Sequence, residues 1–77
     1  MRKRFNADEK AIVVTGAEVE WRNGAHWHRG IILGPIVRQN GWDFAPMRNL
    51  DTTRTIGVGD HYRATPTAVR PRGGWKN

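Results

Sequence analysis

Residues 18–30 read EVEWRNGAHWHRG, with two tryptophans six positions apart on either side of an Asn-Gly pair. Val19 and Trp21 alternate with charged residues, which is the two-residue period of a strand with one apolar and one charged face. Ala25 and Trp27 alternate with two histidines in the same way. This stretch therefore predicts a β-hairpin, and we expect the rest of the fold to be built from similar short strands.

The length of the turn sets which residues of this hairpin face one another. With a two-residue turn at positions 23–24, Trp21 lies opposite His26. Because partners directly across a ladder share a face, this register mixes aromatic and charged side chains on both faces. A three-residue loop over positions 22–24 avoids the mixture, and Gly24 then occupies the left-handed position that such a loop needs.

We therefore expect the three-residue loop. It sets Val19 opposite Trp27 and Trp21 opposite Ala25, so that both tryptophans lie on the face directed at the core. The charged face then holds two further pairs, Glu20 with His26 and Glu18 with His28.

A second hairpin is indicated by IVRQNGWDF, residues 36–44, because an Asn-Gly pair between two short strands is the strongest short-range hairpin signal. A two-residue turn at positions 40–41 leaves one predominantly apolar face and one face with an oppositely charged pair. The expected partners are Gln39 with Trp42, Arg38 with Asp43, and Val37 with Phe44. We expect Phe44 to join Trp21 and Trp27 in the core.

The remaining segments complete an all-β pattern. Asn6 and Glu9 have capping-box spacing, which predicts at most one helical turn before the β-branched run that follows. Positions 48–55 are polar and predict a loop, and apolar residues then recur every two positions up to Ala64, with glycines that indicate a bent strand. Positions 65–71 predict a tight turn and a closing strand over 68–70 that Pro71 ends.

This layout predicts a small five-stranded β-barrel over residues 11–71, between a charged N-terminal segment (1–10) and a basic C-terminal tail (72–77). GAEVEWRNGAHWHRGIIL, residues 16–33, resembles the first hairpin of SH3-like barrels of the Tudor and KOW type. ATPTAVRP, residues 64–71, resembles their one-turn helix and last strand. The chain departs from Tudor domains by lacking Asp-Tyr-Gly after the third strand, which argues against a cage for methylated ligands.

Charge is the strongest functional signal. Thirteen Lys and Arg residues oppose seven Asp and Glu residues in 77, a formal net charge of +6. A small domain this basic attracts polyanions, nucleic acid before anionic membrane. Most of these cations are arginine, whose planar fork pairs bidentately with phosphate, although a GC-rich genome would produce the same bias.

Composition also indicates the cellular compartment of the protein and whether it is an enzyme or binds a metal. It has no cysteine, which fits a reducing compartment, and its longest apolar run is too short to span a membrane, so we expect a cytoplasmic protein without a membrane partner. No serine or cysteine nucleophile exists and the aspartates are scattered, so we expect no enzyme and no cofactor. His26, His28 and His61 could ligate a metal, but surface His–Glu pairs explain the first two equally well.

We therefore expect a nucleic-acid-binding protein, for DNA or RNA, with weak sequence specificity because no recognition helix is visible. The cations expected to neutralise phosphates are Arg38, Arg48, Arg54, Arg63, Arg70, Arg72 and Lys76. The aromatic rings expected to stack on sugar or base are Trp42, Tyr62 and Trp75. The alternative is a protein-interaction module, such as a phage or plasmid adaptor or inhibitor, that docks on an acidic host protein through Trp42 and Tyr62. The oligomeric state stays open.

Overall fold

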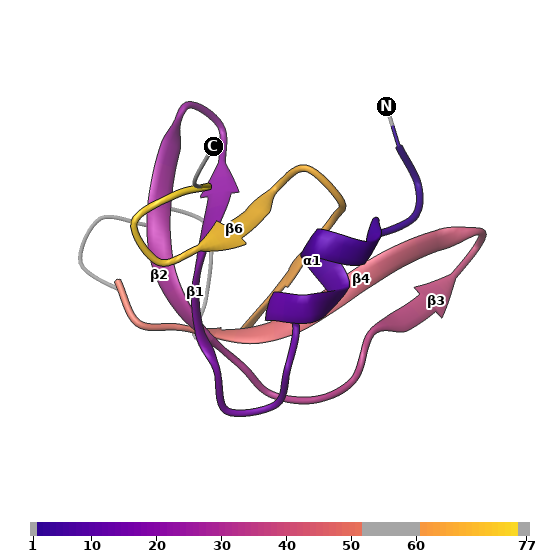
Figure 1. Cartoon of the computed structure of the whole chain (residues 1–77), viewed down its shortest axis with the longest axis horizontal. Helices are drawn as coiled ribbons and strands as arrows, with labels where there is room; N and C mark the ends of the chain where they lie inside the picture. Colours follow the sequence, from indigo (N-terminus) through magenta and orange to yellow (C-terminus); the bar gives the residue numbers. More distant parts are fainter. Residues whose placement is uncertain (1, 52–60, 76–77) are drawn as a thin grey trace.

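The computed structural model describes residues 2–51 and 61–75, which form one curled antiparallel sheet and a short helix (Figure 1). The elements are α1 (Ala7–Ile12), β1 (Glu18–Asn23), β2 (His26–Ile32), β3 (Val37–Gln39), β4 (Trp42–Asn49), β5 (His61–Ala64) and β6 (Val69–Pro71). The strand order is β3-β4-β2-β1-β6, and β5 also pairs with β4. This half-barrel confirms the all-β prediction and is compatible with an SH3-like fold, with six described strands where five were expected.

The helix begins where the capping-box spacing predicted. The Asn6 side chain accepts a hydrogen bond from the Glu9 backbone N–H at 2.8 Å, and the Asn6 N–H donates to Glu9 Oε1 at 2.9 Å. The helix is longer than the single turn expected, since Ile12 is still helical and Val13 is the C-cap. Phe5, just before the cap, is 3 % exposed and belongs to the hydrophobic core.

The predicted β1–β2 register is wrong. Trp21 pairs with His28 and Arg22 pairs with Trp27, so a two-residue turn at positions 24–25, with Gly24 at φ 73°, replaces the expected three-residue loop at 22–24. The expected glutamate–histidine pairs are absent from this hairpin, since its two glutamates face Arg29 and Ile31 instead.

In the observed register, Trp21 and Trp27 lie on opposite faces of the sheet. Trp21 is fully buried, whereas Trp27 lies on the opposite face of the sheet and is only half-buried. The physical reason is space: the Trp21 ring fills the core beside Gly30, where an added Cβ would lie 2.9 Å from Trp21 Cδ1. Tyr62 stacks on the Trp21 ring at 4.3 Å between centroids and fills the neighbouring volume.

The β3–β4 hairpin has the predicted register, with Gln39 opposite Trp42. Asn40 and Gly41 have φ of 54° and 82°, the positive values that its two-residue turn requires. The expected orientation is wrong, because Asp43 points inward and is 1 % exposed while Phe44 is only half-buried on the other face.

Asp43 tolerates burial because the fold supplies its hydrogen bonds. Its carboxylate accepts from Arg38 Nε at 2.9 Å and from the Phe5 backbone N–H at 3.1 Å. Phe5 also occupies core volume that the sequence pattern had given to Phe44.

The later strands are shifted slightly from their predicted bounds. β4 runs through Asn49, so positions 48 and 49 are strand rather than loop, and β6 includes Pro71. The tight turn before β6 is confirmed by the Ala68 N–H, which donates to the Thr65 carbonyl at 3.0 Å. The strand expected over 56–60 lies outside the described residues. Within the described ranges, no helix has both the length and the apolar character needed to cross a membrane.

Candidate nucleic-acid interface

The sheet has an outer face, defined here as the side opposite the buried rings of Trp21 and the side chain of Met47. On it, Arg70 of β6 lies directly across from Glu20 of β1, and Glu20 lies across from Arg29 of β2. Partners across a ladder share a face, so this row brings two arginines that are distant in sequence, Arg29 and Arg70, to either side of Glu20.

A second row crosses the central strands. Ile31 of β2 pairs with Arg48 of β4, and Arg48 pairs with His61 of β5. Pro46, the next residue of β4 on the same face as Arg48, pairs with Arg63 of β5. The outer face therefore carries a further arginine on each of β4 and β5.

These two rows define a diagonal that we call the arginine stripe: Arg70, Arg29, Arg48 and Arg63. Neighbouring strands lie about 4.8 Å apart and residues rise about 3.4 Å along a strand. The backbones of Arg70 and Arg29 are therefore about 10 Å apart, and those of each later pair of neighbours in the stripe are about 8 Å apart. The stripe crosses the outer face of the sheet from β6 to β5.

Carboxylates offset only part of this charge. Arg70 Nε lies 2.6 Å from Glu20 Oε1, and Arg72, in the segment after β6, has Nε 3.6 Å from Glu18 Oε2. The guanidiniums of the outer face with no carboxylate at ion-pair distance, among residues 2–51 and 61–75, are Arg22, Arg29, Arg48 and Arg63. The described outer face is thus strongly cationic, six guanidiniums against two carboxylates.

Trp27 anchors one end of the arginine stripe. Its ring centroid lies 4.1 Å from Arg70 Cζ and 5.3 Å from Arg22 Cζ, distances at which a cation is attracted to the face of an indole. Arg70 is held both by this ring and by Glu20, which fixes the plane of its guanidinium. A guanidinium ordered in advance loses less conformational entropy when it binds a phosphate.

The structure places the sequence-predicted cations in three groups. Arg48, Arg63, Arg70 and Arg72 lie on or beside the outer face. Arg38 instead bonds the inward-pointing Asp43. Arg54 and Lys76 lie outside the described residues.

The predicted aromatic residues are not brought together. Trp42 is half-buried near its hairpin turn, with Lys3 Nζ 5.7 Å from its ring centroid. Tyr62 packs against Trp21 on the core side. Trp75 is 46 % exposed and lies beside α1.

Sequence reasoning missed Arg22, Arg29 and Trp27 as members of this surface. The signal was present, since Trp27 is followed two positions later by Arg29, which shares its face of the strand. It was hidden by the incorrect register, which assigned the Trp27 face to the core.

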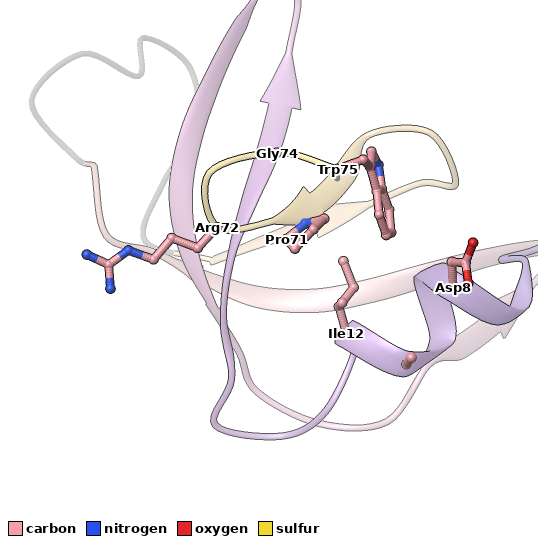
Figure 2. Close-up of a pocket in the computed structure, with 7 residues that line it drawn as sticks. Asp8, Ile12, Pro71, Arg72, Gly74 and Trp75 are labelled. Carbon is pink, nitrogen blue, oxygen red and sulfur yellow. The ribbon is translucent and has the colours of Figure 1, made fainter. Parts of the chain in front are cut away.

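A groove of about 580 Å³ lies between α1 and the segment after β6 (Figure 2). Gly74 has φ 90° and its N–H donates to the Pro71 carbonyl at 2.8 Å, a turn that brings the chain back toward the helix. Figure 2 shows the Trp75 ring directed toward Ile12, with Arg72 pointing away from the groove. None of the four arginines of the stripe is among the described residues that line this groove.

Two carboxyl groups outside the outer face are tied to their own cations. The hydrogen bonds from Arg2 lower the pKa of Glu9, and those from Arg38 and the Phe5 N–H lower the pKa of Asp43. The same contact with Glu9 raises the pKa of Arg2. These pairs join the N-terminal segment and the β3–β4 hairpin to the fold.

The three histidines do not converge. His28 is buried and its Nδ1 lies 3.3 Å from Asp51 Oδ2, whereas His61 lies across from Arg48 on the outer face. Among the described side chains, no group of three His, Asp or Glu residues could hold a metal ion.

No family model, curated protein or solved structure matches this chain.

Proposed function

We propose that this protein binds nucleic acid through the outer face of its sheet, mainly by contacts to phosphate. It would then act as a small basic barrel of the Tudor and KOW kind, with a binding rather than a catalytic role. The observation that carries the proposal is the arginine stripe, in which Arg29, Arg48 and Arg63 follow one another across three strands without a carboxylate partner among the described residues.

Arginine suits this task because its fork donates two parallel hydrogen bonds to phosphate oxygens. Arg70, ordered by Trp27 and Glu20, would fix one end of the bound strand. Arg22 would add a contact beside the same ring. The remaining stripe residues are exposed and able to follow the path of a backbone.

Contacts of this kind carry little sequence information, because phosphates are the same at every base. The described helix α1 has only six residues, so the described part of the chain offers no long helix to read base edges in the major groove. We therefore expect similar affinities for unrelated sequences of equal length.

The test is the salt dependence of binding. Each neutralised phosphate contributes about 0.7 to the slope of log K against log salt for single strands and about 0.9 for duplex DNA. We expect the triple variant Arg29→Gln, Arg48→Gln, Arg63→Gln to lower this slope by about 2 to 3. Fluorescence anisotropy with a labelled oligonucleotide at several salt concentrations measures it.

The matched control removes the same net charge elsewhere, with Lys3→Gln, Arg4→Gln and Lys10→Gln in the N-terminal segment and α1. The control should keep most of the slope of the native chain. Equal losses in the two triple variants would mean that binding follows net charge alone, and the proposed interface would then be wrong.

A second candidate is a protein-interaction module that docks on an acidic protein surface. The groove beside Trp75 favours it, because a half-exposed indole next to Ile12 and Pro71 offers an apolar anchor close to Arg72. A pull-down from nuclease-treated lysate separates the two functions. A partner that survives nuclease treatment and is lost on Trp75→Ala supports this candidate, and loss of all partners on nuclease treatment excludes it.

A further inference from the structure

β4 carries a row of apolar side chains on the outer face of the sheet, next to the arginine stripe. Trp42, Phe44 and Pro46 alternate along the strand with buried residues, and Arg48 of the stripe continues the same series. We call Trp42, Phe44 and Pro46 the β4 apolar row. The two aromatic residues are partly exposed, and their backbones are about 7 Å apart because two positions on a strand separate them. Phosphate contacts to the stripe leave these rings without a ligand.

The neighbouring segments extend this apolar surface. Val37 of β3 lies across from Phe44 and is 37 % exposed. The Leu33 N–H, just after β2, donates to the Pro46 carbonyl at 2.9 Å, and the Leu33 side chain is 44 % exposed. A hollow of about 230 Å³ beside Pro46 is lined in part by Leu33 and His61. A flat apolar ligand therefore meets both aromatic rings and a space beside them.

Cations border the β4 apolar row. Lys3 Nζ lies 5.7 Å from the Trp42 ring centroid. Arg63 of β5 lies across from Pro46, and its Nη1 donates to Gln39 Oε1 of β3 at 3.1 Å. Because Gln39 is a neutral amide, this bond orders Arg63 without neutralising its charge. Lys3 and Arg63 are both exposed, and a phosphate can replace the amide as acceptor, since charge-assisted hydrogen bonds are the stronger ones.

Carboxylates do not offset these cations on this part of the face. Within the described strands β3, β4 and β5, Asp43 is the one acidic residue. It points inward, where Arg38 and the Phe5 N–H bond it. Exposed rings bordered by unneutralised cations fit a ligand in which flat apolar rings alternate with phosphates.

We propose that the β4 apolar row stacks the unpaired bases of a nucleic-acid strand whose phosphates lie along the arginine stripe. The inference rests on the proposed function and narrows it to single strands, loops or ends. In a duplex, a base reaches the row only after it leaves its stack and its pairing partner, which costs free energy. An unpaired base is already available to stack on aromatic side chains.

The experiment compares two labelled single strands of equal length by fluorescence anisotropy. One is a mixed-sequence 12-mer, and the other is an abasic 12-mer with the same phosphates and sugars but no bases. We expect the native chain to bind the strand with bases roughly tenfold more tightly or better, because each ring of the row stacks a base. A native affinity ratio near 1 overturns the inference and leaves the arginine stripe intact.

The same ratio is then measured for the double variant Trp42→Leu, Phe44→Leu, which keeps apolar side chains and removes the rings. We expect the ratio to fall to roughly 1 to 3, since the bases lose their stacking partners. Any displacement of Lys3 or Arg63 weakens both strands alike and leaves the ratio unaffected. If the double variant does not fold, Trp42→Leu alone serves, because Trp42 lies beside the hairpin turn and outside the hydrophobic core.

Trp75→Leu is the matched control, because it removes an exposed indole that lies beside α1, away from the row. It should keep the native ratio, and a double variant that also keeps it overturns the inference.

A duplex of the same sequence tests the restriction to unpaired bases. We expect the native chain and the double variant to bind the duplex with similar affinity, since its bases are not available to the row. A loss of duplex affinity as large as the loss for the single strand overturns this restriction. Equal binding of the native chain and the stripe triple variant to every strand overturns the proposed function itself.

Discussion

Gly30 is the residue that lets the core accept a tryptophan. It lies across from Val19 in the β1–β2 ladder, and the neighbouring Trp21 ring passes over it. A Cβ at this position would lie 2.9 Å from Trp21 Cδ1 and 3.1 Å from Met47 Sδ. In close-packed interiors such overlaps force side chains away from preferred rotamers. The absence of a side chain here therefore determines which volume Trp21 can fill.

We predict that Gly30→Ala lowers the free energy of unfolding by about 1 to 3 kcal/mol, the usual cost of overpacking a core. The closest backbone atom, the Arg48 carbonyl oxygen at 3.3 Å, belongs to the paired strand and limits relaxation. Urea denaturation followed by tryptophan fluorescence measures the change. Gly34→Ala is the control, because nothing lies within 4 Å of its added Cβ. Equal stability of the two variants would contradict the packing argument.

At the scale of elements, α1 joins the N-terminal segment to the sheet. Its capping box closes the first turn, and Arg2 Nη1 and Nη2 each donate to a Glu9 carboxylate oxygen at 2.7 Å. A six-residue helix is too short to be stable alone, so its order depends on the cap and on the burial of Phe5 and Val13. The same segment supplies the Phe5 N–H that bonds Asp43 of β4.

We predict that Asn6→Ala destabilises the protein by about 1 kcal/mol, because the Glu9 N–H loses its acceptor. Asn6→Asp should cost much less, since a carboxylate oxygen accepts the same bond. Thermal unfolding followed by circular dichroism compares the two variants. An Asn6→Ala protein as stable as Asn6→Asp would mean that the cap does not contribute.

At the scale of the whole molecule, arginine–carboxylate pairs link segments that are distant in sequence. Arg70 and Glu20 are 50 positions apart, and Arg38 bonds the Asp43 that also holds Phe5. In these pairs, arginines stabilise the fold by bonding carboxylates. The proposed function depends on the exposed arginines of the outer face that have no carboxylate at ion-pair distance among the described residues, such as Arg29 and Arg48.

We predict that acid destabilises this fold through Glu9 and Asp43. The pKa of each is lowered in the folded chain, so each carboxylate contributes stability above its unfolded pKa of about 4. That contribution is lost as the pH falls through the lower folded values. The midpoint of urea denaturation should therefore decrease steadily from about pH 5 toward pH 2.

The variant Glu9→Gln tests this assignment, because an amide does not titrate. Its stability should be lower than that of the native chain at pH 7, and the difference should shrink as the pH approaches 2. A difference that stays constant over this range would contradict a role for the Glu9 carboxylate in acid unfolding.

Local signals in the sequence predicted two elements well. The Asn40-Gly41 turn sets the β3–β4 register because both residues adopt the positive φ that this turn requires. The capping box depends only on residues three positions apart. Both features depend on residues close together in the chain, so tertiary contacts did not alter the predicted turn or cap.

The orientation of the strands could not be predicted in this way. Period-two alternation shows that a strand has two faces, but what else fills the core decides which face turns inward. Asp43 points inward because Arg38 and the Phe5 N–H satisfy it there. Trp27 points outward because Trp21 and Tyr62 already fill the core and the arginines cover its ring.

By itself, the sequence determined a small β fold, its net positive charge, the cap of its helix and one hairpin register. Only the tertiary structure decided which tryptophan is buried and which arginines share a surface. The arginine stripe exists because β6, β1, β2, β4 and β5 pair side by side, and these pairings join residues as far apart as Val19 and Pro71. Pairings of that range depend on packing around a common core, which no short window of sequence contains.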